Sequence, residues 1–529
     1  MPADLPTDVV IAGAGPNGLM LACELGLAGV RPVVLERLPA PGTEPRANGL
    51  VGQVVRMLDR RGLYERLSGS THPPQPTSQF PFGAMRLDLT VLAGNPLYTL
   101  PVPQARVVEV LVERANELGV EIRWGHELTG LNQDGDAVTV GVTGPDGSYE
   151  LRARYLVGAD GGHSPTRKLA GIGFPGVTTD QTVSRTAHAT VPAEWVDPAT
   201  GALDVPGHGT IPPFMHHRTD SGLFVFAPFP GRTPMVTTVE FDRLGSDRPM
   251  TLGEMRESVR RVLGAEVPLG PPDDEGPHVL RRLEGGNSRV ADRFRDGRVL
   301  LVGDAAHVHS AIGGPGLNLG LQDAVNLGWK LAAEVGGDAP AGLLDTYEAE
   351  RRPASRRVLM HTQAQSALIA PGSEVTALRE LFTELLADPQ TVAHIAGLMS
   401  GADIRYDMGA AATHPLVGRW APDMLLDVDG RGSVRLVELT RTARPLLLDL
   451  TDGASVAAAT ARWTGDWAGR LDVVTARPQP SGVPATALLL RPDCYVAWAS
   501  AAPRPDTAEL TALADGVGRW FGGRLRTVA

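Results

Sequence analysis

The sequence predicts an α/β fold made of several units, and three observations support this prediction. The chain has 529 residues, a length that accommodates about two to four domains with real cores. Near the N-terminus a glycine-rich turn joins a short apolar strand at 9–12 to a helix at 19–28. A second apolar strand at 299–302 ends in Gly303 and Asp304. Ligands of open α/β sheets bind at such carboxyl ends of strands, so both motifs predict ligand binding.

Charge and composition exclude several classes of protein. Lys and Arg number 49 against 60 Asp and Glu, which gives a formal charge of −11, whereas nucleic acids and anionic membranes select basic surfaces. Apolar residues make up 43% of the chain and charged residues 21%, as in globular enzymes and unlike disordered chains. We therefore expect neither a nucleic-acid partner nor a membrane partner.

The cysteines and the N-terminal pattern predict a reducing, cytoplasmic setting. Cys23 and Cys494 are the two cysteines, and neither belongs to a CxxC or Cys/His spacing. We therefore expect no metal site and at most one disulfide. No basic leader precedes an apolar segment, and no run of 18 apolar residues occurs, so neither a signal peptide nor a membrane span is expected.

The first glycine-rich turn has the spacing of a dinucleotide-binding turn. Gly13 permits a tight turn, Gly15 lets backbone N–H groups approach a pyrophosphate, and Gly18 lets the helix pack closely on the strand. The helix N-terminus faces the phosphates with its partial positive charge. Glu36, at the end of the next strand, can accept hydrogen bonds from ribose hydroxyls. The residues expected to bind the cofactor here are Gly13, Ala14, Gly15, Pro16, Asn17, Gly18, Glu36 and Arg37.

The second motif indicates which dinucleotide to expect. A carboxylate at Asp304 suits a polyol chain such as ribityl, although a helix cap explains that residue equally well when it is taken alone. The glycine-rich segment 313–316 then opens a long helix at 317–333, whose apolar residues recur at helical spacing. Its N-terminus could direct N–H groups and the helix dipole at the pyrimidine end of a flavin, which favours FAD.

Further segments extend the pattern along the chain. Asp160-Gly161 follows an apolar strand between the two glycine-rich turns, and three later phrases lie at 343–353, 404–406 and 489–498. Taken in order, these segments resemble the FAD-dependent aromatic hydroxylases of the p-hydroxybenzoate hydroxylase class, the group A flavoprotein monooxygenases. The resemblance is closest to actinobacterial members that oxidise polyketides and related antibiotics.

The resemblance implies FAD as the cofactor, NADPH or NADH as the co-substrate, and O2 as the oxidant. It places Gln104 at the flavin's linker, Leu128 near the adenine, and Asp160 at both the FAD and the nicotinamide nucleotide, although an Asp-Gly turn explains Asp160 as well. Asp304 matches the family's ribityl ligand. Arg46 matches a basic position beside the flavin that is linked to ring movement, which makes it a candidate catalytic residue. The residues implied around the ring are Gly303, Pro315, Gly316, Leu317 and Asn318.

The sequence also departs from the family pattern. Residues 310–312 are Ser, Ala and Ile where the family usually has two prolines and a threonine, and Pro315 stands where Gln or Lys is common. Residues 51–53 replace a His-x-Arg. In the family these positions surround the reacting edge of the flavin, so they bear on oxygen activation and substrate placement rather than on FAD binding. Three nearby arginines are expected on a solvated helix face: Arg56, Arg60 and Arg61.

Function follows from the resemblance as an expectation. It implies a monooxygenase that hydroxylates a polycyclic, polyketide-like aromatic substrate through a C4a-hydroperoxyflavin in secondary metabolism. Two alternatives in the same fold stay open: Baeyer–Villiger oxygenation of a polycyclic ketone or quinone, and hydroxylation that inactivates an antibiotic. A more remote alternative, supported by the altered loop at 310–315, is a protein that binds flavin and a polycycle without redox chemistry.

Residues 172–290 are expected to form a β-sheet domain that binds the substrate. Several side chains there could line a pocket for a flat polycycle, although apolar residues on strands more often form ordinary core. These candidates are Phe214, Met215, His216, Phe224 and Phe226.

Histidines supply the candidates for a base. His217 is the candidate catalytic base, because a phenolic substrate gains from a nearby group that takes its proton. His216 and His217 would point to opposite faces of a strand, so at most one of them can serve. His307 and His309 together with Asp304 resemble a metal cluster only superficially, since the flavin explains Asp304 better.

The predicted domain organisation has three parts. A discontinuous FAD-binding domain comprises 1–171 and 291–400, the substrate sheet 172–290, and a C-terminal domain 401–529. Strand-like runs separated by a helix predict an αβ fold for the last part, and relatives carry a thioredoxin-like domain there. Without a CxxC motif it cannot run disulfide chemistry, so we expect a structural role or one in forming a homodimer.

Overall fold

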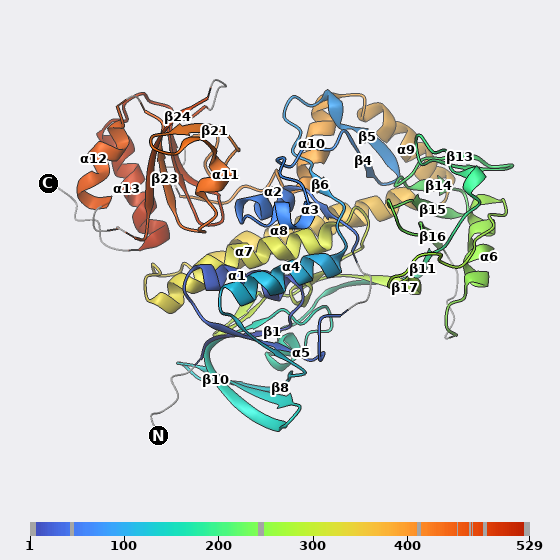
Figure 1. The fold of residues 1–529 in the computed structure, drawn as a ribbon, viewed down its shortest axis with the longest axis horizontal. Helices are drawn as coiled ribbons and strands as arrows, with labels where there is room; N and C mark the ends of the chain where they lie inside the picture. Colours follow the sequence, from blue (N-terminus) through green and yellow to red (C-terminus); the bar gives the residue numbers. More distant parts are fainter. Residues whose placement is uncertain are drawn as a thin grey trace.

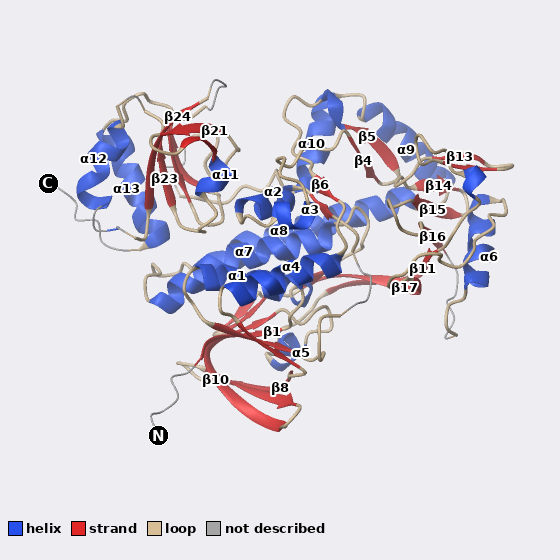
Figure 2. Cartoon of the chain, in the orientation of Figure 1, coloured by secondary structure: helices blue, strands red, loops and turns tan. Residues whose placement is uncertain are grey.

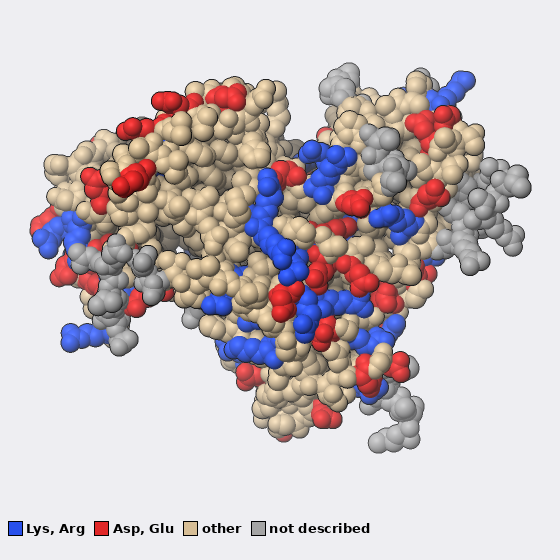
Figure 3. Space-filling view, turned by 180° about the vertical axis from the view of Figure 1, so that it is seen from behind, with Lys and Arg blue, Asp and Glu red and all other residues tan. Residues whose placement is uncertain are grey.

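The structure is a computed structural model that describes residues 7–42, 47–241, 248–409, 414–451, 453–464, 467, 469–479 and 484–522. Helices and strands occur along the whole chain (Figure 2), which confirms the predicted α/β class. Three large sheets lie apart from one another, and long helices fill the space between them (Figure 1). Seen from behind, a notch separates the two upper lobes, and acidic and basic side chains are interspersed on that face (Figure 3).

The first sheet has eight strands and carries the N-terminal glycine-rich turn. Its order is β18-β19-β10-β1-β2-β7, and β8 and β9 extend it as a hairpin beside β10. The pairs β1–β2, β1–β10, β10–β19 and β2–β7 are parallel, so the carboxyl ends of these strands lie at one edge. The strands are β1 (Thr7–Ala12), β2 (Pro32–Glu36), β7 (Glu121–Trp124), β8 (Glu127–Gln133), β9 (Val138–Gly144), β10 (Gly147–Gly158), β18 (Arg295–Asp296) and β19 (Val299–Leu301).

Helices cover the face of this sheet that is turned toward the other two. They are α1 (Pro16–Leu27), α4 (Gln104–Glu117) and α7 (Pro315–Gly336), side by side in Figure 1. Val9, Val10 and Ile11 are fully buried, as expected for a parallel strand with both faces covered. The predicted strand at 9–12 and the predicted helix at 317–333 therefore form, each slightly longer than expected.

The second sheet has six strands and corresponds to the expected substrate sheet. Its order is β14-β15-β16-β11-β17-β20, and α6 (Leu252–Leu263) packs against it. The strands are β11 (Gly176–His188), β14 (His217–Thr219), β15 (Gly222–Ala227), β16 (Met235–Phe241), β17 (Leu280–Val290) and β20 (His307–Val308). The last strand, β20, comes from outside 172–290 and directly precedes the turn into α7. The exact domain boundaries stay a prediction.

The third sheet forms the C-terminal unit. Its order is β22-β21-β24-β23-β25-β26, with β23 and β24 parallel and the other pairs antiparallel. Helices α12 (Ser455–Thr464) and α13 (Thr507–Phe521) pack on it, which gives the expected thioredoxin-like αβ arrangement. The strands are β21 (Leu425–Val428), β22 (Gly432–Arg435), β23 (Leu446–Asp449), β24 (Asp472–Pro478), β25 (Ala487–Leu490) and β26 (Val496–Ser500).

Other elements connect the three sheets. The long helix α8 (Asp345–Ile369) follows α7, and α9 (Ser373–Leu385) and α10 (Pro389–Ser400) pack near the hairpin of β4 (Gln79–Phe82) and β5 (Met85–Asp88). The short elements β3 (Leu50–Val51), α2 (Gln53–Arg60), α3 (Tyr64–Ser68) and β6 (Thr99–Leu100) lie at the start of α7 and beside the C-terminal unit. Among the described residues, no helix combines the length and the apolar character needed to cross a membrane.

The solvated helix face expected at Arg60 and Arg61 is wrong. Arg60 is 0% exposed and Arg61 is 5% exposed, because α2 packs against the C-terminal unit. Arg60 donates to the Ala421 carbonyl at 2.7 Å. Arg61 forms two hydrogen bonds to the buried Glu24 carboxylate and donates to the Pro492 carbonyl at 2.8 Å. These arginines join the units instead of facing water.

Candidate functional site

The first glycine-rich turn is built so that side chains cannot replace two of its glycines. Gly13 has φ +108°, and a Cβ there would lie 2.5 Å from the Ala159 carbonyl oxygen. A Cβ on Gly18 would lie 2.0 Å from the Gly13 carbonyl oxygen. Gly15 is different, since a Cβ there would meet nothing within 4 Å. The turn thus packs strand against helix on one side and leaves space at Gly15, where a phosphate would approach.

The first turn of α1 offers backbone donors at that space. Gly15 is the N-cap, Pro16 is the first helical residue, and no side chain caps the helix. The first N–H groups of a helix have no partner within the helix and favour an anion. At the end of β2, Glu36 accepts from the N–H of Ala14 at 2.8 Å and from that of Leu38 at 3.0 Å. Its carboxylate therefore lies beside the turn, while Arg37 is exposed.

The two glycine-rich motifs, nearly 300 residues apart in sequence, meet at Asn17. A Cβ on Gly303 would lie 2.0 Å from Asn17 Nδ2, and one on Gly320 of α7 would lie 2.4 Å from the same atom. Asn17 Oδ1 is buried and has no hydrogen-bond partner among the residues that the structure describes. Asp304, the next residue after Gly303, is exposed at this edge of the sheet. The two turns thus form one continuous surface at the carboxyl ends of β1, β2 and β19.

This surface fits FAD. The open space at Gly15, the uncapped start of α1 and the Glu36 carboxylate suit the ADP half of the cofactor. Asp304 offers acceptors for a polyol, and the unpartnered oxygen of Asn17 lies between the two turns. Gly13 to Gly18 with Glu36 would hold the ADP half, and Gly303 with Asp304 the ribityl chain.

The start of α7 is tied to the segment that departs from the family pattern. Asn318 Oδ1 accepts from the N–H of Val51 at 2.8 Å, and its Nδ2 donates to the Gly314 carbonyl at 2.6 Å. Gly314 is the N-cap with φ +66°, and Pro315 is the first helical residue. The Asn318 side chain therefore braces the turn, and the N–H groups of Gly316 and Leu317 in the first helical turn are the donors available to a flavin ring.

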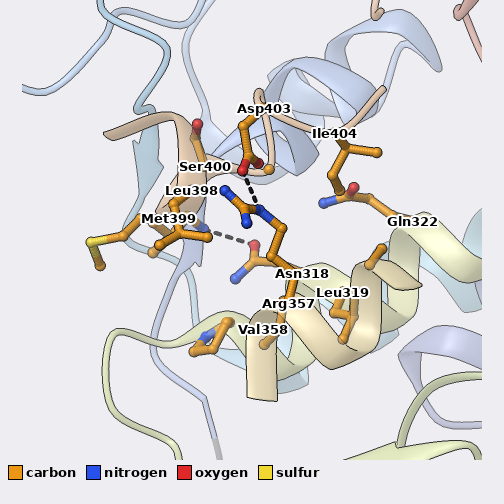
Figure 4. A pocket seen from close by; sticks show the side chains of 14 residues that line it. Asn318, Leu319, Gln322, Arg357, Val358, Leu398, Met399, Ser400, Asp403 and Ile404 are labelled. Atoms are coloured by element: carbon orange, nitrogen blue, oxygen red, sulfur yellow. Dashed lines mark hydrogen bonds and ion pairs between the residues drawn. The ribbon is translucent and has the colours of Figure 1, made fainter. Parts of the chain in front are cut away.

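A small cavity of about 30 Å³ lies between the start of α7, α8 and α10. Figure 4 shows Asn318, Arg357 and Asp403 around it, with an ion pair between Arg357 and Asp403. Such a volume holds about one water molecule, so this cavity is too small for a polycycle.

Three further residues predicted to bind the cofactor lie near the first glycine-rich turn or on neighbouring elements of the same domain. Asp160 accepts from the N–H of Thr166 at 2.8 Å and from its hydroxyl at 2.7 Å, and also bonds Ser164. It thereby fixes the start of α5 (Pro165–Leu169). The N–H of Gln104 donates to the Ala47 carbonyl at 2.8 Å, which brings the start of α4 to the loop after Arg46. Leu128 is buried on β8. Arg46 itself lies outside the described residues, and the roles of all four stay predictions.

The predicted substrate residues divide between core and surface. Phe224 and Phe226 are fully buried in a cluster with Met255 and Val259 of α6, the ordinary core position that the sequence left open. Phe214 is 47% exposed and packs edge-on against Phe229 at 5.3 Å between ring centroids.

The two neighbouring histidines have different surroundings. His217 Nε2 lies 2.8 Å from His208 Nε2, and His208 Nδ1 in turn lies 2.7 Å from the Leu263 carbonyl, so His217 faces the end of α6. His216 Nδ1 is buried and meets no hydrogen-bond partner in the described part of the chain, and Met215 beside it is half-buried. The structure thus offers His216 rather than His217 as an unpaired polar group, and both roles stay predictions.

The site brings the substrate sheet to the start of α7. Strand β20 pairs with β17, and the chain then passes through His309 to the turn that begins α7. The His309 ring would lie 3.4 Å from a Cβ on Gly316, and its Nδ1 lies 2.9 Å from the Ser310 carbonyl. The loop after Arg46 also meets this sheet, since Asn48 Nδ2 donates to Met235 Sδ at 3.4 Å.

Sequence reasoning missed a buried charged group behind the second turn. Asp323 is 0% exposed. It accepts from the Gly303 N–H at 3.2 Å and from Arg351 Nε at 2.7 Å, and it lies 2.6 Å from His307 Nε2. A signal was present, because Asp323 lies among the apolar residues of the inward face of α7, where an unpaired carboxylate would be costly.

Three histidines are expected to make the fold sensitive to acid. Burial lowers the pKa of His216, His309 and His361 to about 4 from the ordinary 6.5. Below pH 6.5 the unfolded chain takes up protons on these residues while the folded chain does not, so stability falls between pH 6.5 and 4. Each histidine contributes about 2 kcal/mol to this loss at pH 5.

Urea unfolding at pH 7 and pH 5 measures this loss. His361→Phe should reduce the difference between the two pH values by about a third. The same change at the exposed His72 should leave the difference as it is. Equal unfolding free energies at both pH values would contradict the prediction.

Fold and site together define a class: a flavin-binding α/β protein with a separate substrate sheet and a C-terminal αβ unit. The chain belongs to the FAD-dependent aromatic-ring hydroxylases. The family model described as FAD binding domain matches residues 6–362, and the model described as aromatic-ring hydroxylase, C-terminal, matches residues 414–523.

Similar proteins cover nearly the whole chain. The 12-dehydrotetracycline 5-monooxygenase/anhydrotetracycline 6-monooxygenase of Streptomyces rimosus is 44% identical over 528 residues, covering 97% of this chain and 99% of that protein. The solved structure of an anhydrotetracycline hydroxylase from Streptomyces rimosus matches with a TM-score of 0.84 and 41% identity, covering 98% and 100%. A dialkyldecalin synthase of Streptomyces rugosporus is 37% identical and covers 93% and 95%.

These findings confirm the predicted family and cofactors. The protein is an FAD-dependent monooxygenase that uses O2 and a reduced nicotinamide co-substrate.

Proposed function

We propose that this monooxygenase hydroxylates a polycyclic aromatic substrate of the tetracycline type. The observation that carries the proposal is the similarity to the anhydrotetracycline monooxygenase of Streptomyces rimosus, which extends through the substrate sheet and the C-terminal unit. The formal charge of −11 is compatible with a small-molecule substrate and does not favour a nucleic acid. We also infer a cytoplasmic location.

The residues of the chain have distinct tasks in this proposal. Bound FAD supplies the oxygen activation. Glu36 accepts hydrogen bonds from the adenosine ribose, and Asp304 accepts them from the ribityl chain. The first N–H groups of α7, uncapped after Gly314, hold the pyrimidine edge, where the helix dipole stabilises negative charge.

The second sheet places the substrate against that edge. Its strand β20 leads directly to the start of α7, so the sheet and the cofactor surface share one boundary. Excluding water there protects the activated oxygen. His216 directly precedes β14 and its Nδ1 has no hydrogen-bond partner among the described residues, so it is the group that we place toward a substrate hydroxyl.

The test uses the purified holoenzyme with anhydrotetracycline as the probe. Oxidation of NADPH and of NADH is followed with and without the probe, and the product is examined by mass spectrometry and NMR. We expect stimulated oxidation of one nucleotide and a product heavier by one oxygen. Hydroxylation and ring expansion both add one oxygen, so the product mass cannot distinguish them. NMR of the product can, because the carbon skeleton differs. The proposal is contradicted if no compound in a panel of linear polycycles stimulates the oxidation of either nucleotide.

A second candidate is a ring-forming reaction without net oxidation. It is favoured by the 37% identity to the dialkyldecalin synthase and by the unusual loop at 310–315. In that case product forms at the same rate whether the flavin is oxidised or reduced, and no nucleotide is consumed. Anaerobic assays without a nucleotide distinguish the two candidates.

The C-terminal unit is also a candidate dimer surface, and this stays a prediction. Analytical ultracentrifugation of the holoenzyme, with and without FAD, tests it. A homodimer is expected at twice the chain mass of 55.9 kDa. A single species at the chain mass would contradict it.

A further inference from the structure

A continuous series of buried contacts begins at the second glycine-rich turn. The Gly303 N–H donates to Asp323 Oδ2 at 3.2 Å, and the same oxygen lies 2.6 Å from His307 Nε2. Gly303 has φ +60° and directly precedes Asp304. The Asp323 carboxylate therefore fixes the backbone of the residue that presents Asp304 to the cofactor.

Arg351 of α8 continues the series away from the cofactor surface. Its Nε donates to Asp323 Oδ1 at 2.7 Å, its Nη2 to the Leu319 carbonyl at 3.2 Å, and its Nη1 to the Tyr406 hydroxyl at 2.9 Å. Arg351 is 0% exposed. All three partners lie in a low-dielectric interior, where each hydrogen bond is strong and each loss is costly. The orientation of Asp323 thus depends on Arg351, and that of Arg351 depends on Tyr406.

Tyr406 carries the series into the C-terminal unit. Its ring stacks on that of Tyr495, with 4.0 Å between centroids and 27° between planes. Tyr495 lies in the turn between β25 and β26, where its carbonyl accepts from the Arg491 N–H at 2.9 Å. The C-terminal sheet is therefore four contacts from the Gly303 backbone.

A second connection runs beside the first. Arg491 of the C-terminal unit bonds both carboxylate oxygens of Glu350, at 2.6 and 2.8 Å, and Glu350 precedes Arg351 on α8. Glu350 also bonds Lys330 of α7 at 2.7 Å. Helices α7 and α8 are thus held to the C-terminal unit at two adjacent points, which keeps Arg351 from turning independently.

We propose that the C-terminal unit is part of the machinery that holds FAD, with Asp323, Arg351 and Tyr406 as positioning residues for the Gly303–Asp304 turn. Two sites joined in this way must be linked reciprocally. FAD binding then tightens the C-terminal unit, and loosening the C-terminal unit weakens FAD binding by the same factor. The inference rests on FAD binding and is independent of which substrate is oxidised.

Tyr406→Phe is the principal test, because it removes one hydroxyl and leaves the ring that stacks on Tyr495. We expect the FAD dissociation constant to rise about fivefold, the lower end of typical coupling between sites, with a shift in the midpoint potential of the bound flavin. Tyr149→Phe is the matched control. It removes a hydroxyl that accepts from an arginine in the same way, from Arg123 Nη1 at 3.1 Å, outside the series. It should leave both quantities unchanged.

Hydrogen exchange on wild-type protein tests the reverse direction. Amides of β26 and of the Tyr495 turn should exchange more slowly after FAD is added to FAD-free protein. In Tyr406→Phe, the factor by which FAD slows this exchange should be about fivefold smaller than in wild type. Asp323→Asn should bind FAD more weakly than Tyr406→Phe. If Asp323→Asn fails to fold, the other two measurements decide.

Two results overturn the proposal. One is a Tyr406→Phe protein with the wild-type dissociation constant and flavin potential. The other is exchange in β26 that does not respond to FAD. Failure of the enzyme to oxidise anhydrotetracycline would leave these measurements intact, because none of them uses a substrate.

Discussion

A Gly18→Ala protein is expected to lose almost all of its FAD. A Cβ at this position would lie 2.0 Å from the Gly13 carbonyl oxygen and 3.1 Å from Ala159 Cβ. A backbone carbonyl and an alanine methyl occupy that space, so no flexible side chain can move aside. Helix α1 must therefore shift away from β1, and the N–H groups of its first turn shift with it. Overpacking of this kind costs about 1–3 kcal/mol, and the displaced donors weaken FAD binding further.

The ratio of flavin absorbance at 450 nm to protein absorbance measures the loss. We expect the FAD dissociation constant to rise tenfold or more, since about 1.4 kcal/mol changes a binding constant tenfold, so the ratio falls well below the wild-type value once unbound FAD has been removed. Gly518→Ala is the matched control, because Gly518 lies inside α13 and a Cβ there meets nothing within 4 Å. That protein should keep its full FAD content and be slightly more stable, as alanine favours helix. Full flavin content in Gly18→Ala would contradict the prediction.

The sequence permitted the prediction of features that depend on neighbours in the chain. The turn at 13–18 follows from glycine spacing between an apolar strand and a helix, because its steric demands are local. The start of α7 could be predicted in the same way, from the glycine-rich segment 313–316 that precedes residues with helical spacing. Both therefore have the expected conformation in the structure.

Contacts between distant segments could not be predicted from sequence. Asn17 packs against Gly303 and Gly320, and nothing near Asn17 in sequence indicates this. Arg60 and Arg61 lie on a helix whose polar spacing is typical of a solvated face, yet carbonyl groups of the C-terminal unit accept their hydrogen bonds. Burial of these arginines depends on a partner surface some 360 residues away.

The aromatic residues of the second sheet show the same limit. Phe224 and Phe226 on β15 point to one face of the strand and Val225 to the other. The same alternation is expected for a strand that lines a pocket and for one that packs in the core. Which face α6 covers decides between the two, and α6 packs on the face that bears the phenylalanines. Periodicity identified the strand but carried no information about the helix that would cover it.

Arg491→Leu is expected to lower the free energy of unfolding by about 4 kcal/mol, as when one partner of a buried ion pair is removed. Arg491 is 1% exposed. It bonds both oxygens of Glu350, pairs with Asp493, and lies with its guanidinium carbon 4.4 Å from the centre of the Trp520 ring. Leucine would leave two buried carboxylates, those of Glu350 and Asp493, facing the single ammonium of Lys330.

Acid unfolding provides a second measurement of the effect of Arg491→Leu. Burial alone would raise the pKa of Glu350, but Arg491 and Lys330 lower it to about 2 from the ordinary 4.5. A carboxyl with a depressed pKa stabilises the fold above pH 4.5, and this contribution is lost as the pH falls toward 2. Without Arg491 the pKa of Glu350 rises, so the variant should unfold at a higher pH than wild type during acid titration.

A surface ion pair and a double variant separate charge pairing from packing. Arg477→Leu removes an arginine whose side chain is 74% exposed and pairs with Asp427 at 3.5 Å, and exposed pairs contribute about 0–1 kcal/mol. Glu350→Met combined with Arg491→Leu removes one anion and one cation and leaves Lys330 facing Asp493, so part of the lost stability should return. If the single Arg491→Leu variant unfolds at the same urea concentration as Arg477→Leu, the buried pair does not stabilise the attachment of the C-terminal unit. If the double variant is no more stable than Arg491→Leu alone, the unpaired carboxylate of Glu350 does not account for the loss.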